Sequence, residues 1–230
     1  MPDKVLLLGG TLEAALLSRR LAVDPSVELI VSLAGRVAAL PDLPGRVRVG
    51  GFGGAEGLRD FLRAEGITRV IDATHPFAAA ISAHAAQACA ALGIPLQRVE
   101  RPQWCRHPGD RWHWADDMGM AARMAAALGR RVLLTVGKGP LAPFARHGGP
   151  DYVIRLIDPP KASLGFRRAA IVLGRGPFTL KDEVALMRRF SVDLLVSKAS
   201  GGPATEAKLA AARMLDVPVV LVKRPLGAAE

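Results

Sequence analysis

Two glycines and a threonine behind the first apolar run, and an arginine behind the second, are the first residues with recognisable chemistry. Gly9-Gly10-Thr11 opens a helical pattern, and at such a turn backbone N–H groups bind a pyrophosphate. Arg36 follows the second apolar run, and no acidic residue occurs between Glu28 and Asp42. An arginine there suits the 2′-phosphate of NADPH, whereas an acidic residue would bind the free ribose hydroxyl of NADH. The pattern favours an NADPH site. The alternative is an ordinary strand–helix turn with glycines for geometry alone, because the full G-x-G-x-x-G spacing is absent.

Three further turns combine glycine with a cationic side chain. Each follows a predicted strand: Gly137-Lys138-Gly139, Gly174-Arg175-Gly176 and Lys198-Ala199-Ser200-Gly201-Gly202. Glycine lets backbone N–H groups approach a ligand, and Lys or Arg adds positive charge. Together these turns predict a site for an anionic ligand. The alternative is a set of exposed turns that happen to be basic.

Thr74 and His75 follow another predicted strand. Pro76 is expected in the first turn of the next helix, which places both residues at the carboxyl edge of the sheet, where a nicotinamide would arrive. In the alternative interpretation Thr74 is a helix cap and His75 a satisfied partner. The glycine cluster at 50–54 either closes over the cofactor, with Gly51 as the candidate binding residue, or is a mobile loop.

Charge and composition set broad limits. The 230 residues are 50% hydrophobic and 23% charged, which suits one large or two small globular domains. The net charge of +10 indicates an anionic partner: nucleic acid, a membrane surface or an acidic small molecule. Basic residues are scattered in pairs and aromatic residues make up only 5%, so we expect no nucleic-acid partner. The longest apolar stretch carries polar residues, so we expect no membrane partner.

Cysteine usage and the first residues bear on location. Cys89 and Cys105 are the only cysteines, which fits a reducing compartment. The chain begins without the basic leader and apolar core of a signal peptide, so we expect a cytoplasmic protein. Cys105, His107, His113 and Asp116 lie close in sequence, but no pair has structural-zinc spacing, and we expect no metal. The sequence also lacks a G-x-S-x-G elbow, so Ser–His–Asp hydrolysis has no support.

Alternating apolar runs and helical patterns position these residues. The predicted strands are Val5–Leu8, Val27–Leu33, Val70–Ala73, Pro95–Val99, Val132–Val136, Tyr152–Ile157, Ala170–Leu173, Leu194–Ser197 and Val219–Val222. The predicted helices are Leu12–Leu21, Gly54–Glu65, Phe77–Leu92, Met118–Leu128, Leu180–Phe190 and Ala204–Leu215. This order is typical of α/β proteins with parallel sheets covered on both faces.

Two similar α/β units follow from an internal repeat. A helix, a turn with proline, a strand and Arg-Pro end at Arg101-Pro102 and again at Arg224-Pro225. We predict an NADPH-binding Rossmann-like domain over 1–100, a crossover linker over 101–117, and a second, substrate-binding Rossmann-like domain over 118–230. A ligand cleft is expected between the units. Exchange of the duplicated final strand between the units is left open.

The ordered motifs resemble the precorrin-6A reductase family of cobalamin biosynthesis. They run over nearly the whole chain: Leu8-Gly9-Gly10-Thr11-x-Glu13-Ala14, Ser32-Leu33-Ala34-Gly35-Arg36, Gly51-Phe52-Gly53-Gly54, Asp72-Ala73-Thr74-His75-Pro76-Phe77-Ala78, Arg101-Pro102-x-Trp104, Gly174-Arg175-Gly176-Pro177-Phe178, Ser197-Lys198-x-Ser200-Gly201-Gly202 and Thr205-Glu206-x-Lys208. The resemblance implies NADPH-dependent reduction of one double bond of precorrin-6A, giving precorrin-6B. Hydride would go to ring carbon C19 and a proton to its neighbour. Metal-free and cobalt-containing substrates are both compatible with it.

Roles for the site residues follow from this resemblance. Cofactor binding is expected at Gly9, Gly10, Thr11, Leu12, Ser32, Arg36, Gly51 and Thr74, with Ser32 and Arg36 on the 2′-phosphate. Binding of the polycarboxylate tetrapyrrole is expected at Lys138, Arg175, Lys198, Ser200, Gly201 and Thr205, because cations offset its carboxylates. His75 and Lys198 are candidate catalytic proton donors, with water or the substrate's own acid groups as alternatives.

Two other functions stay open at this point. One is a non-enzymatic protein, either a nucleotide-sensing regulator or a nucleic-acid binder, which the basic charge allows. The other is an NADPH-dependent reductase of a different, smaller acid. The number of subunits is not predicted.

Overall fold

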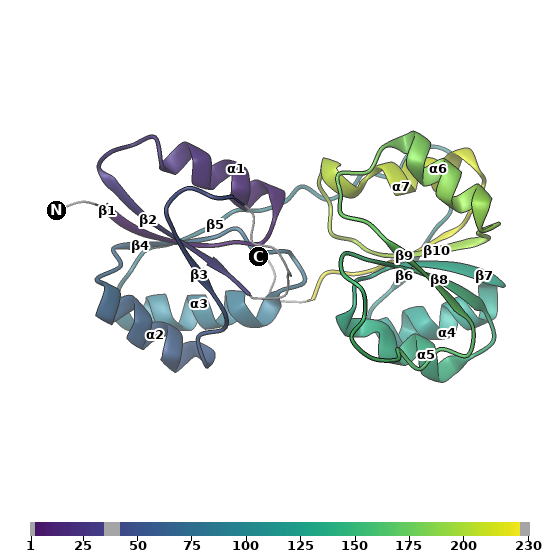
Figure 1. The fold of residues 1–230 in the computed structure, drawn as a ribbon, viewed down its shortest axis with the longest axis horizontal. Helices are drawn as coiled ribbons and strands as arrows, with labels where there is room; N and C mark the ends of the chain where they lie inside the picture. The colour runs from purple at the N-terminus through teal and green to yellow at the C-terminus, as the bar shows by residue number, and fades with distance from the viewer. Residues whose placement is uncertain (1–2, 35–41, 226–230) are drawn as a thin grey trace. The chain divides into compact units, whose positions relative to one another are not determined.

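The computed structural model describes residues 3–34 and 42–225, and the chain divides into two compact units. The first unit runs to Arg101 and takes up the chain again at Pro225, and the second unit spans Pro102–Arg224. Each unit holds one parallel sheet with helices on both faces (Figure 1). The predicted α/β class with two parallel-sheet units is therefore confirmed.

The sheet of the first unit has five strands in the order β3-β2-β1-β4-β5. Its strands are β1 (Asp3–Leu8), β2 (Val27–Leu33), β3 (Arg46–Val49), β4 (Arg69–Asp72) and β5 (Leu96–Arg98). Its helices are α1 (Leu12–Leu21), α2 (Gly54–Glu65) and α3 (Ala79–Leu92). Helix α1 covers one face of the sheet, and α2 and α3 cover the other (Figure 1).

Apolar side chains alternate between the two faces of this sheet, as the pleat requires. Leu6 and Leu8 of β1 pack in a buried cluster with Leu58 of α2 and with α3. Val5 and Leu7 pack on the opposite side with α1. Near-continuous apolar strands such as β1 are what a sheet covered on both faces needs.

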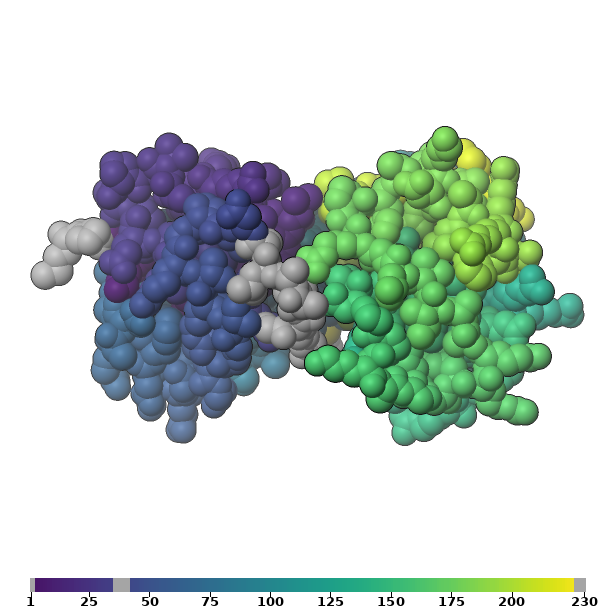
Figure 2. Space-filling model, viewed as in Figure 1, coloured from purple at the N-terminus to yellow at the C-terminus, as the bar shows by residue number. Residues whose placement is uncertain are grey.

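The sheet of the second unit has six parallel strands in the order β6-β11-β10-β7-β8-β9. Its strands are β6 (Trp112–Ala115), β7 (Arg131–Thr135), β8 (Asp151–Leu156), β9 (Ala169–Leu173), β10 (Leu194–Lys198) and β11 (Val219–Val222). Its helices are α4 (Met118–Leu128), α5 (Ala142–His147), α6 (Leu180–Arg189) and α7 (Ala207–Met214), with short 3₁₀ turns η1 (Gly139–Leu141) and η2 (Pro203–Thr205). Helices α6 and α7 cover one face, and α4 and α5 cover the other (Figure 1). Figure 2 shows the same face of the molecule in space-filling form, with side chains covering the helices and strands of this unit.

The elements that the sequence analysis missed are mainly short strands and one short helix. Strands β3 and β6 and helix α5 are absent from the prediction. The second unit begins at Pro102, so most of the expected linker over 101–117 belongs to it, and its expected start at residue 118 is too late. Residues Trp112–Ala115 form an edge strand because they pair with β11, more than a hundred residues away. Four-residue strands carry too little periodic pattern to be identified locally.

Two further outcomes concern the helices and the final strands. Helix α3 begins at Ala79, so Pro76 lies in a turn before the helix rather than in its first turn. Strand β5 pairs with β4, and β11 pairs with β10 and β6, so each final strand joins the sheet of its own unit. Among the described residues, none of the helices has the length and hydropathy to cross a membrane.

Candidate active site

The glycine turn of the first unit connects three strands at their carboxyl ends. The Gly9 N–H donates to the carbonyl of Ser32 in β2, at 2.9 Å. Thr11 caps α1: its hydroxyl accepts from the Ala14 N–H at 3.1 Å and donates to the Ala73 carbonyl, just after β4, at 2.7 Å. Gly10 has φ +106°, which favours glycine, and a Cβ there would meet no atom within 4 Å. The turn therefore has an open backbone surface at a helix N-terminus, which fits a phosphate group.

A second feature of this turn is the ion pair between Glu13, in the first turn of α1, and Arg101, which follows β5. Burial is the largest single influence and raises the pKa of the Glu13 carboxyl, but the hydrogen bonds that the carboxylate accepts, led by the one from Arg101, and the positive charge of Arg101 together lower the pKa below its ordinary value. The pair fastens the end of β5 to the helix that carries the candidate phosphate site. Leu12, the first residue of α1, is 46% exposed.

Replacing Glu13 with glutamine will make the protein less stable near about pH 7 and will have little effect in acid. A carboxyl whose pKa is lowered by folding stabilises the native state above its unfolded pKa of about 4.3, and this contribution is lost as the pH falls through the folded pKa. Because the pair is partly exposed, we expect at most about 1 kcal/mol. Urea unfolding midpoints between about pH 7 and pH 3 measure the effect. Glu56, exposed in the first turn of α2, is the matched control; a stability loss that does not shrink in acid would contradict the prediction.

The glycine cluster at 50–54 is held by Arg48 of β3. Its guanidinium donates to the carbonyl of Gly50 at 2.6 Å and to that of Gly51 at 2.7 Å, and lies 3.9 Å from the ring centroid of Phe52. A Cβ on Gly57 would clash with the Phe52 carbonyl, so the loop also packs closely on α2. These contacts favour a fixed loop over a mobile one. Gly51 is exposed, as cofactor contact requires.

A buried aspartate positions the residues after β4. Asp72 is 3% exposed, and its carboxylate accepts from the Thr74 N–H at 3.0 Å and from the Thr74 hydroxyl at 2.6 Å. His75 accepts the Phe77 N–H on Nδ1 at 3.1 Å, which places the proton of the neutral ring on Nε2. Helix α3 is capped at Ala78, so Thr74 is not its cap. Thr74 and His75 lie at the carboxyl edge, partly exposed.

The predicted anion-binding residues of the second unit follow three strands that end at one edge. Lys138 comes after β7, Arg175 after β9 and Lys198 at the end of β10. Strands β10 and β7 are neighbours, while β8 separates β7 from β9. Lys138 and Arg175 are exposed, and Lys198 is partly buried. Parallel strands bring these cations to the same edge, as the sequence predicts.

Two loops at this edge touch each other. A Cβ on Gly176 would lie 3.4 Å from the carbonyl oxygen of Ala204, in the turn that carries Thr205. The loop that carries Arg175 is supported from beneath by Arg155, whose guanidinium lies 4.0 Å from the ring centroid of Phe178. The Lys198–Thr205 loop and the loop that carries Arg175 therefore form one connected surface.

The remaining predicted residues of this edge are more enclosed. Ser200 is 6% exposed, and Gly201, at φ +68°, is buried with no room for a Cβ against Pro102. The Thr205 hydroxyl is buried and has no hydrogen-bond partner within the described part of the chain. Ser32 is 6% exposed at the end of β2, and Arg36 lies outside the described residues.

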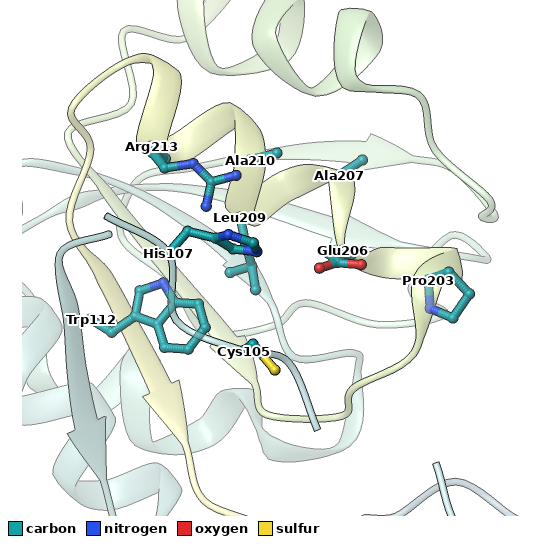
Figure 3. A pocket seen from close by; sticks show the side chains of 9 residues that line it. All are labelled: Cys105, His107, Trp112, Pro203, Glu206, Ala207, Leu209, Ala210 and Arg213. Carbon is teal, nitrogen blue, oxygen red and sulfur yellow. The ribbon is translucent and has the colours of Figure 1, made fainter. Parts of the chain in front are cut away.

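A pocket of about 270 Å³ lies elsewhere, on the flank of α7 (Figure 3). His107 lies between Trp112 and Arg213, and Cys105 and Glu206 complete its polar lining (Figure 3). None of the predicted nucleotide or substrate residues lines it. Over residues 3–34 and 42–225, no group of three or more His, Cys, Asp or Glu side chains is placed to hold a metal ion.

Several supporting residues were given no role from the sequence: Arg48, Asp72, Trp104, Lys208 and Arg224. The duplicated Arg-Pro pair is a signal that could have identified one of them. Arg101 binds Glu13 beside the first glycine turn, and Arg224 binds the Ala199 and Ser200 carbonyls at 3.1 and 3.2 Å. The arginine after the last strand thus binds the first turn of α1 in the first unit and a loop at the carboxyl edge in the second.

Comparisons with known proteins show the family of the chain. The family model described as "Precorrin-6x reductase CbiJ/CobK" matches residues 4–230. The precorrin-6A reductase of Rhodococcus erythropolis is 48% identical over 96% of this chain and 89% of its own, and that of Rhodobacter capsulatus is 44% identical over 96% and 88%. A solved structure titled CobK precorrin-6A reductase matches with a TM-score of 0.94 and 43% identity, covering 100% of this chain and 91% of that one. The chain belongs to the precorrin-6x reductase family.

Proposed function

We propose that this protein reduces one double bond of precorrin-6A with NADPH, giving precorrin-6B in cobalamin biosynthesis. The observation that carries the proposal is the pairing, in one chain, of an open glycine turn capped by Thr11 with a second carboxyl edge that gathers Lys138, Arg175 and Lys198. The first suits a dinucleotide and the second suits a polyanion. Membership of a reductase family joins the two into one reaction.

The cofactor of a reductase of this kind is a nicotinamide, and NADPH is the form that the residues favour. Gly10 presents open backbone at the N-terminus of α1, where the dipole favours a pyrophosphate. The buried Ser32 lies near the end of β2 and Arg36 comes after β2 in the sequence, at the position where the adenosine ribose binds in such folds. Bound NADPH supplies the hydride.

The substrate class follows from the second unit. A corrin precursor carries many acetate and propionate groups around its rim, and each charge-assisted bond to Lys or Arg contributes about 1.5–3 kcal/mol. Exposed Lys138 and Arg175 hold the rim, and Ser200, Gly201 and Thr205 shape the enclosed end of the same edge. Their main work is orientation, since the acceptor carbon must lie about 3–3.5 Å from the hydride donor.

His75 and Lys198 are the candidates for donating the proton that the reduced macrocycle takes up. His75 accepts the Phe77 N–H on Nδ1, so the neutral ring carries its proton on Nε2. We assign this form of the ring to orienting the nicotinamide or substrate. Lys198, at the end of β10, is the stronger candidate donor. The kcat of Lys198→Met and His75→Asn variants at saturating substrate separates the two roles.

The decisive experiment mixes the purified protein with NADPH and metal-free precorrin-6A and follows the cofactor and macrocycle absorbance bands. We expect equimolar loss of NADPH and conversion of the macrocycle. Parallel reactions with the cobalt-containing substrate and with simple enoates identify the acceptor. Turnover of enoates without the tetrapyrrole would support a reductase of smaller acids. Salt-dependent DNA binding without NADPH oxidation would support a nucleic-acid binder.

A further inference from the structure

Three side chains bind the backbone carbonyls of the Lys198–Thr205 loop. Arg224 donates to the carbonyls of Ala199 and Ser200 at 3.1 and 3.2 Å. The Trp104 indole N–H donates to the Gly202 carbonyl at 2.8 Å, and the Lys208 ammonium donates to the Thr205 carbonyl at 2.5 Å. Four carbonyl oxygens along eight residues are thus bonded to side-chain donors that the reaction itself does not require.

Trp104 is the central member of this group. Its ring faces the Lys208 ammonium, 4.8 Å from Nζ to the ring centroid, and Lys208 is only 3% exposed. A cation beside an aromatic face in a buried setting is stabilised by the ring quadrupole. Pro102, two residues earlier, accepts the Gly202 N–H at 3.1 Å, and the buried Gly201 packs against it. The segment 102–104 therefore holds Gly202 by hydrogen bonds and Gly201 by close packing.

The direction of the bonds matters for a polyanionic ligand. A carbonyl oxygen carries partial negative charge and repels a carboxylate, whereas an N–H group attracts one. A carbonyl already bonded to a donor is not presented to the ligand. The carbonyls of Ala199, Ser200, Gly202 and Thr205 are all bonded in this way, which leaves the cations of the edge as the groups that meet the ligand. A loop fixed in this state loses less conformational entropy on binding.

We propose that Trp104 is a positioning residue for substrate binding: with Lys208 and Arg224, it fixes the Lys198–Thr205 loop with four of its carbonyl oxygens bonded to side-chain donors rather than presented to substrate carboxylates. The proposal rests on the proposed function for the identity of the substrate. Trp104 itself touches neither cofactor nor reacting atoms. Replacing Trp104 is expected to weaken substrate binding and to leave NADPH binding unchanged.

The test compares Trp104→Phe with wild type and with Trp114→Phe. Phenylalanine keeps an aromatic face over Lys208 but removes the N–H donor. Trp114, 44% exposed in edge strand β6 of the same unit, is the matched control. We expect Trp104→Phe to raise the KM for precorrin-6A about fivefold, the effect of one lost hydrogen bond, and to leave the KM for NADPH unchanged. Amide hydrogen exchange over residues 198–205 is expected to be about fivefold faster, while the control matches wild type.

Each outcome decides the proposal. Faster exchange in the loop together with a selective rise in the substrate KM supports it. Unchanged exchange, unchanged substrate KM, or equal rises in both KM values would overturn it. A wild-type protein without activity on precorrin-6A would reject the proposed function instead, and the exchange measurement then decides alone whether Trp104 fixes the loop.

Discussion

Replacing Arg36 with alanine will raise the KM for NADPH by about tenfold or more and leave the KM for NADH nearly unchanged. A charge-assisted bond to a phosphate contributes about 1.5–3 kcal/mol, which corresponds to roughly 10- to 150-fold in affinity. NADH lacks the 2′-phosphate and loses nothing when the arginine is removed. The basis is the sequence after β2, where no acidic residue occurs between Glu28 and Asp42 and where Ser32 is buried at the strand end.

Steady-state kinetics with both cofactors measure this effect. Arg63→Ala is the matched control, because Arg63 is 64% exposed in the last turn of α2, away from the strand ends. An equal rise of both KM values after the Arg36 substitution would show a general role in folding or pyrophosphate binding. If neither KM changed, Arg36 would not bind the 2′-phosphate, and the argument for a preference for NADPH would be wrong.

The strands and helices that the sequence predicts correctly are those with long, regular patterns. Strands such as β1 and β10 are buried on both faces, so their apolar runs are nearly continuous and easily recognised. The start of helix α1 is predictable because Thr11, a residue type that favours helix N-caps, occupies the cap position. In contrast, β6 exists because Trp112 pairs with Val219, a partner that no local pattern reveals.

In the candidate site, too, some residues can be identified from the sequence and others cannot. Glycines and cations at strand ends can be identified, because their residue types indicate anion binding. The residues that hold them are less visible, since their role depends on which carbonyl they meet in the fold. Asp72 is an example: its carboxylate is buried and accepts both donors of Thr74, yet in sequence it is one acidic residue at the end of a strand.

Replacing Glu183 with alanine will cost about 3–5 kcal/mol of stability, the largest loss that we expect from a single change in the second unit. Glu183 is fully buried in α6, and its carboxylate lies 2.9 Å from the guanidinium of Arg155 in β8, which is also buried. Removing the carboxylate leaves that guanidinium buried with its charge uncompensated. For a chain of this size, the melting temperature should fall by roughly 6–20 °C.

The matched control and the double variant separate this charge effect from simple loss of packing. Lys181→Ala removes an exposed charge from the same helix and should leave the melting temperature nearly unchanged. Replacing Arg155 and Glu183 together with methionine should recover much of the loss, because no unpaired charge then remains. A single variant as stable as the control would contradict the prediction. Because Arg155 also lies under Phe178, the loss should extend to the loop that carries Arg175, and the KM for the tetrapyrrole should rise while that for NADPH stays the same.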